Sequence, residues 1–287
     1  MNTFFHFDKY QCTFPDVPVE QVMRSFQFVS DPTDMRPVLP GYRKALNFGD
    51  AVYVLYDATA GDYGAHAIVQ GGDSCQPIVD ELRQILPDHK VTRFDVAADF
   101  DYPNAFKELE GIVLQVALEN EIKTNVAGDY YGVTDGRTLY AGAPTSTHRC
   151  RVYEKGLEMR AKGVQPEASV NWVRVEHQIR PSKKGHARIA ASRMSPDEAA
   201  FSNNWVASIS QRLGAEVQAP VKLSTKFVQS EFQRALEHMA KQYGPSIRRA
   251  ISEGETNSQE MQEFFYRRMI LGQKQRTAKE HSLDWGL

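Results

Sequence analysis

The sequence predicts an α+β fold, with antiparallel sheet built from two strand–helix–strands units and followed by a helical C-terminal region. Three observations predict it. Residues 1–194 alternate strand-like and helix-like patterns, most strand-like segments are separated only by turns, and helical periodicity replaces them from about Ser195. Because parallel strands need a crossover helix, the scarcity of helices between strands argues against a doubly wound parallel sheet.

The first unit is expected over about residues 1–88. Alternating apolar and polar residues predict its strands, and Gly- and Asp-rich turns separate them. Its second helix places Ile78 and Leu82 on one face, the spacing of an amphipathic helix. The expected elements are strands at 4–14, 42–48, 51–56 and 64–70, with helices at 19–29 and 75–86.

The second unit, about 89–194, repeats the order of strand, helix and several strands. Its helix carries Phe106, Leu109 and Val113 at helical spacing. The expected elements are strands at 90–100, 123–133, 137–142, 150–157 and 171–180, with a helix at 105–121. The repeated order suggests an internal duplication.

The helical region is expected over 195–272. Ser195-Pro196-Asp197-Glu198 has the pattern of a capping box with proline at the first helical position, and Gly214 ends that segment. A second helix at 224–243 is expected to stop at Gly244-Pro245, and a third spans 258–271. Residues 273–287 lack apolar periodicity and predict a loose tail.

Composition is that of an ordinary globular protein, with 41% hydrophobic and 24% charged residues and a net charge of −2. This excludes a collagen-like, coiled-coil or largely disordered chain.

No apolar run approaches the roughly 20 residues of a membrane span, and the N-terminus lacks a signal-peptide pattern. Cys12, Cys75 and Cys150 are too far apart for a disulfide framework or a Cys-x-x-Cys site. We therefore expect a cytoplasmic protein with reduced thiols and no membrane partner.

Charge is distributed unevenly along the chain. Residues 1–136 contain 10 basic and 21 acidic side chains, whereas residues 137–194 contain 12 basic and 4 acidic ones. A basic block of this kind suggests an anionic partner, and it equally fits a solvated basic face with no partner.

Three of the expected strands carry charged side chains along one face. Since side chains alternate in a strand, these residues share a face opposite an apolar one. The sets are Arg93, Asp95 and Asp99; Arg151, Tyr153 and Lys155; and Arg174, Glu176, Gln178 and Arg180. If the strands are neighbours, the face suits phosphodiester chemistry. Carboxylates are ligands for Mg²⁺ or Mn²⁺, a tyrosine hydroxyl can act as a covalent nucleophile, and cations stabilise phosphoryl charge.

Each set also has a simpler interpretation. An Arg93–Asp95 pair is typical of a solvated sheet face, Tyr153 is common in strands, and Glu176 between arginines fits a surface network. Other motifs are uninformative. No Gly-Lys-Ser/Thr phosphate loop and no His-x-His pair occurs, and the basic segment 183–188, with Lys183 and Lys184, predicts a loop in unspecific phosphate contact.

Three segments in order resemble the replication initiation factor family: VTRFDVAADFD (91–101), GRTLYAGAPTSTHRCRVYEKGLE (136–158) and WVRVEHQIR (172–180). Its members are rolling-circle initiators of filamentous phages and staphylococcal-type plasmids, with relatives among relaxases of conjugative elements. The resemblance implies an enzyme that nicks and rejoins one strand at an origin. A tyrosine stays joined to the 5′-phosphate, a 3′-hydroxyl primer is released, and a divalent metal assists.

Carried onto this chain, the resemblance makes Tyr153 the nucleophile, with Lys155 beside it. The acidic positions implied for Mg²⁺ or Mn²⁺ are Asp95, Asp99, Glu158 and Glu176, of which Asp95 and Glu176 are preferred. The DNA-binding side chains expected on the same strands and the adjoining loop are Arg93, Arg151, Arg174, Arg180, Lys183 and Lys184. Nearby cations are expected to lower the pKa of the tyrosine hydroxyl. One departure from the family pattern is 143–146, Ala-Pro-Thr-Ser, where Arg or Lys usually precedes the serine.

On this hypothesis residues 1–194 form the nicking domain, and 195–272 contact DNA, a homodimer partner or a host helicase. The expected partner is origin DNA, both duplex and single-stranded. Three alternatives stay open. A non-enzymatic origin or single-stranded-DNA-binding protein would need neither Tyr153 nor the carboxylates, and a water-using metal-dependent nuclease would tolerate Tyr153→Phe. An interaction protein built on the acidic face of 1–136 would need none of these residues.

Overall fold

The computed structural model describes residues 4–60, 64–130, 136–215, 231–254 and 256–265. The chain falls into two compact units, residues 1–225 and 226–287. The first contains every sheet strand and every predicted site residue. The second contains the helices α8 (Glu231–Ser252) and α9 (Ser258–Phe265).

The first unit is built on one ten-stranded sheet in the order β2-β3-β4-β5-β1-β6-β10-β9-β8-β7, and every neighbouring pair is antiparallel. The prediction of an antiparallel α+β fold is confirmed. The strands are β1 (His6–Phe14), β2 (Thr33–Met35), β3 (Tyr42–Phe48), β4 (Val52–Ala58), β5 (Ala65–Gln70), β6 (Lys90–Asp101), β7 (Thr124–Ala127), β8 (Thr138–Ala141), β9 (His148–Tyr153) and β10 (Trp172–Ile179).

Both halves of the sheet follow one order of elements. β1 and β6 pair at the centre, and each is followed by a helix, α1 (Val19–Arg24) or α3 (Ala105–Glu119). The chain then crosses to an edge of the sheet and returns strand by strand, ending with β5 beside β1 and β10 beside β6. As a result, strands from the two halves meet only along the β1–β6 pair.

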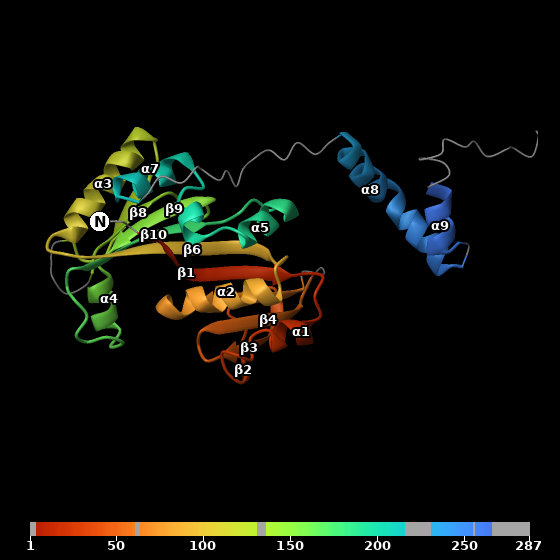
Figure 1. Ribbon diagram of the computed structural model, residues 1–287, viewed down its shortest axis with the longest axis horizontal. Coiled ribbons are helices and arrows are strands. Elements are labelled where there is room, and N and C mark those ends of the chain that lie inside the picture. Colours follow the sequence, from red (N-terminus) through yellow and green to blue (C-terminus); the bar gives the residue numbers. More distant parts are fainter. Residues whose placement is uncertain (1–3, 61–63, 131–135, 216–230, 255, 266–287) are drawn as a thin grey trace, which may run out of the picture. The chain divides into compact units, whose positions relative to one another are not determined.

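Helices cover one face of the sheet and bury its apolar side chains. α2 (Cys75–Ile85) buries Cys75, Ile78, Val79 and Leu82 at helical spacing, and α3 buries a similar stripe. These residues join the buried strand residues in one core. In Figure 1, α3 lies on one side of the strands and α4 (Lys155–Ala161) on the other. A groove lined mainly by polar side chains lies on the face bordered by α4.

Three predicted boundaries in the second half are wrong. The strand expected over 123–133 ends at Ala127. The strand expected over 150–157 ends at Tyr153, and α4 begins at Lys155. Gly156 fits this turn because a Cβ there would lie only 1.7 Å from the carbonyl oxygen of Ser169. The basic segment 183–188, expected as a loop, enters α5 (Gly185–Ser192), since Ala187 and Ala191 lie four residues apart and are both buried.

The capping box at Ser195 is confirmed. The Ser195 hydroxyl accepts from the Glu198 backbone N–H, and the Glu198 carboxylate accepts from the Ser195 N–H, so α6 (Pro196–Ala200) starts there. α7 (Asn204–Arg212) follows, and both helices bury apolar side chains in the core of the first unit.

The expected stop at Gly244-Pro245 is wrong, because α8 continues through both residues to Ser252. A proline inside a helix loses one backbone hydrogen bond and crowds the carbonyl four residues earlier. The further clash with the Cβ of the preceding residue is absent here, because that residue is Gly244. The predicted tail at 273–287 lies outside the described residues. Among the helices of the described ranges, none is both long enough and apolar enough to cross a membrane.

Candidate nucleic-acid site on the polar sheet face

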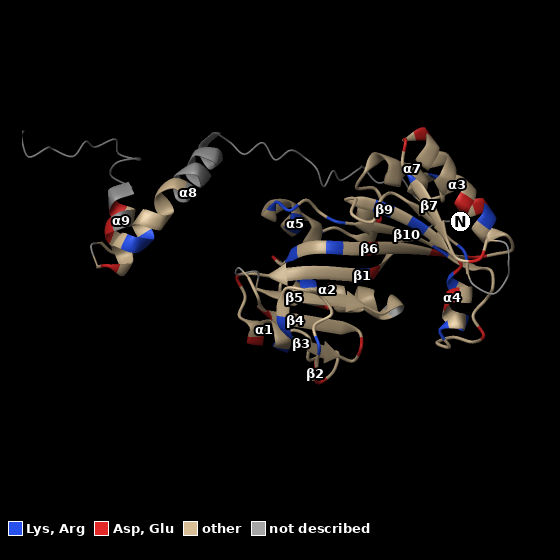
Figure 2. Cartoon of the chain, turned by 180° about the vertical axis from the view of Figure 1, so that it is seen from behind, with Lys and Arg blue, Asp and Glu red and all other residues tan. Residues whose placement is uncertain are grey.

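The three strands with charged faces are neighbours in the order β6–β10–β9. Asp95 lies opposite Gln178, Arg174 opposite both Asp99 and Tyr153, and Glu176 opposite Arg151. Figure 2 shows the Lys and Arg positions along β6 and β10. The adjacency that the sequence analysis assumed is therefore present, and we call this surface the polar face.

Tyr153 lies beneath the cations of the polar face. It is only 4% exposed, with the Arg151 guanidinium carbon 4.4 Å and the Lys155 Nζ 5.6 Å from its ring centre. Its hydroxyl lies 3.5 Å from Arg151 Nη2, a long hydrogen bond. Burial and the Glu176 carboxylate raise the pKa of Tyr153, and Arg151 and Arg174 only partly oppose them. The expectation that nearby cations lower this pKa is wrong, because desolvation of the phenolate outweighs their attraction.

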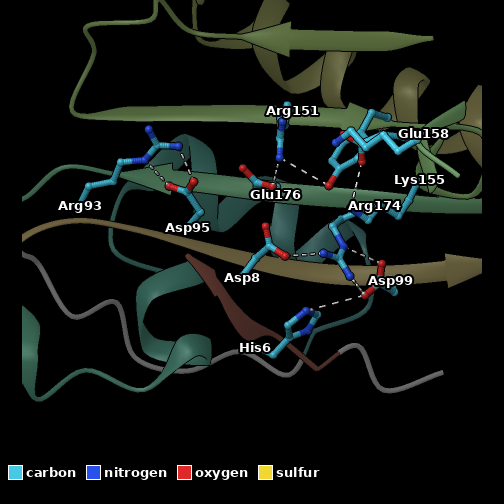
Figure 3. A network of polar contacts seen from close by, with 12 residues as sticks. His6, Asp8, Arg93, Asp95, Asp99, Arg151, Lys155, Glu158, Arg174 and Glu176 are labelled. Carbon is cyan, nitrogen blue, oxygen red and sulfur yellow. Dashed lines mark hydrogen bonds and ion pairs between the residues drawn. The ribbon is translucent and has the colours of Figure 1, made fainter. Parts of the chain in front are cut away.

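Asp95 and Glu176 face one another near the centre of the sheet (Figure 3). Both are 2% exposed. Arg93 donates to both oxygens of Asp95, and Arg151 Nη2 donates to Glu176 Oε2 at 2.5 Å. Burial and the neighbouring Asp95 charge raise the pKa of Glu176 to about 7, although Arg151 acts in the opposite direction. Each carboxylate is thus paired with its own arginine, and the two carboxylates repel one another.

Arg174 binds a second pair of carboxylates. Its guanidinium donates to both oxygens of Asp99, at 2.8 and 2.7 Å, and to Asp8 of β1. Asp8 was not among the site residues predicted from the sequence. It occupies a β-bulge, where the β1–β6 register shifts between Phe7 and Lys9, and this places its side chain on the polar face. A strict period of two puts Asp8 on the side of buried Tyr10, so no sequence signal marked it.

Glu158 lies on α4 rather than on a sheet strand. Its carboxylate accepts from Lys155 at 2.9 Å and from Lys162 at 2.8 Å. Burial alone would raise its pKa, but the two ammonium groups lower it. Glu158 therefore orients Lys155 beside Tyr153 and lies apart from the Asp95–Glu176 pair.

A groove of about 940 Å³ runs along the polar face, and we call it the polar groove. Its lining includes both carboxylates and cations, among them Asp8, Lys9, Arg93, Asp95, Arg151, Lys155, Glu158, Lys162 and Arg174. Arg93, Arg151 and Arg174, expected to bind DNA, are all part of it. Lys183 and Lys184 are exposed at the start of α5 and line neither this groove nor the cavity described below.

Two of the carboxylates on the polar face have the chemistry of divalent-metal ligands. Within the described residues, no group of three His, Cys, Asp or Glu side chains is close enough to hold an ion. Asp95 and Glu176 nevertheless fit one by their chemistry. They offer hard oxygen donors, and their mutual repulsion, which raises the pKa of Glu176, is a charge that a cation would offset. Asp99 and Glu158 instead satisfy Arg174 and the two lysines.

The raised pKa of Glu176 predicts a pH dependence of stability. A carboxyl whose pKa is higher in the folded than in the unfolded chain stabilises the fold at low pH, and this contribution disappears as the pH rises from about 4.5 to about 7. We expect the free energy of unfolding of the wild type to fall over this window relative to Glu176→Gln, measured by urea unfolding. Glu167→Gln, at an exposed carboxylate, should follow the wild type. Parallel curves for all three proteins would contradict the prediction.

Comparisons with known proteins give a matching family and a similar solved structure. The model of the family described as "Replication initiation factor" matches residues 89–264, which is more than half of the chain and includes β6, β9 and β10. Among solved structures, the chain is similar to a rolling circle replication initiator protein from Geobacillus stearothermophilus. The identity is 22% and the TM-score 0.49, over 70% of this chain and 83% of that one. No curated protein matches the sequence. From the extent of the family match, the chain belongs to the replication initiation factor family.

Proposed function

We propose that this protein is a rolling-circle initiator that nicks and rejoins one strand at a replication origin by tyrosine transesterification. Family membership supports a role in replication initiation. The observation that carries the chemistry is the position of Tyr153. Its hydroxyl lies 3.5 Å from an Arg151 nitrogen that also binds Glu176, and the two cations against its ring, Arg151 and Lys155, line the polar groove.

The polar groove suits a single strand of DNA. Lys9, Lys155 and Lys162 line it and can contact successive phosphates. Because Tyr153 is recessed below Arg151 and Lys155, the scissile phosphate has to enter the groove to reach the hydroxyl. A strand paired in a duplex is too constrained for this, which favours an origin that is locally single-stranded.

In the cleavage step, the Tyr153 oxygen attacks the scissile phosphorus in line with the leaving 3′-oxygen. A bond forms between the tyrosine oxygen and phosphorus, and the bond from phosphorus to the 3′-oxygen breaks. The phenolic proton is taken up by solvent, and the 3′-oxygen takes a proton from solvent and leaves as the primer hydroxyl.

Charge on the phosphoryl oxygens is stabilised by Arg151 and Lys155, the cations closest to the tyrosine ring. A divalent metal, when bound, would be held by Asp95 and Glu176 and would supply further stabilisation of this charge. Since both bonds are phosphodiesters, the step is close to reversible. Attack of a 3′-hydroxyl on the phosphotyrosine would then reseal the strand.

The test is a nicking assay on supercoiled plasmid carrying the cognate origin, with Mg²⁺ or Mn²⁺. We expect nicked circles that depend on the metal and are lost with EDTA, and a labelled strand whose retarded migration is reversed by protease. A plasmid without the origin is the control. Binding without nicking under either metal would support a non-enzymatic DNA-binding protein, and nicking without an adduct would support a water-using nuclease.

A further inference from the structure

A second cavity, of about 270 Å³, adjoins the polar groove. We call it the arginine cavity, because four of its lining residues are Arg93, Arg149, Arg151 and Arg180. Arg93 and Arg151 also line the polar groove, so the two hollows are contiguous. One water needs only about 10–15 Å³, so the cavity has room for a polyatomic anion.

The sheet register builds this cavity. Arg149 of β9 lies opposite Gln178 of β10, and Tyr140 of β8 lies opposite Arg151. Arg180 follows β10, where its backbone N–H donates to the Thr147 carbonyl at 2.7 Å. Most of the cavity residues therefore sit on adjacent strands, and Arg180 directly follows one, which suits a precise binding site.

The arginines of the cavity are only half neutralised. Arg93 and Arg151 are paired with Asp95 and Glu176. Arg149 instead stacks over the Tyr140 ring at 4.0 Å, and Arg180 donates to the Ser146 carbonyl at 3.3 Å. In the part of the chain that the structure describes, neither has an ion pair with a carboxylate. Burial, Arg93 and Arg149 together lower the pKa of Arg180, as expected where cations crowd one another.

Several donors around the cavity also lack an acceptor. Gln178 is only 8% exposed, and its Nε2 has no hydrogen-bond partner among the described residues. The buried Nε atoms of Arg149 and Arg151 have none either. Buried donors are nearly always satisfied in folded proteins. A ligand that brings both negative charge and several acceptor oxygens would match this lining.

We propose that the arginine cavity binds a backbone phosphate of the target strand adjacent to the scissile phosphate. The inference rests on the proposed function for the location of the scissile phosphate at Tyr153. Arginine binds phosphate oxygens in a bidentate manner, and such contacts fix the register of a strand rather than read its bases. Arg180 was already expected from the sequence to contact DNA. The cavity adds Arg149 and Gln178, and all three side chains would contact the same phosphate.

The test measures binding of a fluorescein-labelled oligothymidylate of about 12 nucleotides, without metal and in a Tyr153→Phe background. We expect Arg180→Gln and Arg149→Gln each to weaken binding about tenfold. Each should also reduce the slope of log affinity against log salt by about 0.7, the value for one lost contact to single-stranded DNA. Arg180→Lys keeps the charge and should retain the slope. Arg43→Gln, an exposed arginine paired with Asp57 on the far half of the sheet, is the matched control.

Unchanged affinity and slope in both glutamine variants would overturn the proposal. A second result would also overturn it. If inorganic phosphate protects the Tyr153→Phe protein from thermal unfolding but does not protect the glutamine variants, and all three proteins bind the oligonucleotide equally, then the cavity holds a free anion and not a phosphate of the strand. A slope lost equally in Arg180→Lys would indicate a structural role and count against it. This binding measurement does not depend on cleavage. If the glutamine variants lose salt slope while the wild type fails to nick the origin plasmid, the cavity still binds a phosphate of the strand, and only the proposed transesterase activity is refuted.

Discussion

Tyr153→Phe is expected to abolish both nicking and the protease-sensitive adduct, with a loss of nicking rate on the order of a thousandfold or more. The substitution removes one oxygen, whose described contact is the 3.5 Å approach of Arg151, and leaves the buried ring in place. The fold and the binding of single-stranded DNA should therefore persist. The measurement is a denaturing gel of end-labelled origin strand, run with and without protease.

The matched control is Tyr56→Phe, a half-buried tyrosine on β4 in the other half of the sheet, which should nick as the wild type does. Nicking by Tyr153→Phe without an adduct would assign the attack to water. A surviving adduct would move the nucleophile, and the geometry would then point to Tyr140, which lines the arginine cavity opposite Arg151. Tyr130 is less suited because its hydroxyl donates to Glu110, and Tyr131 lies outside the described residues.

Arg174→Met is expected to lower the free energy of unfolding by about 3 kcal/mol. The Arg174 side chain is only 3% exposed and holds both Asp8 and Asp99. Removing it leaves two carboxylates facing one another without their cation. The expected loss lies at the low end for a broken buried ion pair because Asp99 keeps partial contact with water and also accepts from Trp172. Urea unfolding at neutral pH measures it.

A surface pair supplies the comparison for Arg174→Met. Arg212 pairs with Glu119 at 2.6 Å, with both side chains about one third or more exposed, so Arg212→Met should cost less than about 1 kcal/mol. Adding Asp8→Asn to Arg174→Met should restore part of the lost stability, because one unpaired charge disappears. Equal losses in the two single variants would show that the Arg174 network contributes no more than a surface ion pair.

The charged face of the site was predictable because strand periodicity is local. Arg93 and Asp95, or Arg174 and Glu176, are two residues apart, and a period of two places each pair on one side of its strand. The adjacency of β6 and β10 was not predictable in the same way. About seventy residues separate them, and the order of strands depends on packing in the whole sheet.

The rest of the site depends on features with no local signature. The β1 bulge moves Asp8 onto the polar face, and the close approach of Gly156 to Ser169 turns the chain into α4 and brings Lys155 over Tyr153. Formal charges predicted a lowered pKa for Tyr153. The structure raises that pKa because the depth of the ring, which sequence cannot give, decides the balance between desolvation and attraction.

The central β1–β6 pair has a consequence for how the chain can be divided. The family match begins at residue 89, yet β6 pairs with β1 over residues 90–97 and with β10 over residues 94–101. A piece starting there would carry a twelve-residue strand with an open row of backbone donors and acceptors, a template for self-association. It would also lack the Asp8 counter-charge to Arg174. The first half of the chain thus covers the β6 edge of the second half through β1 and supplies a carboxylate partner for Arg174.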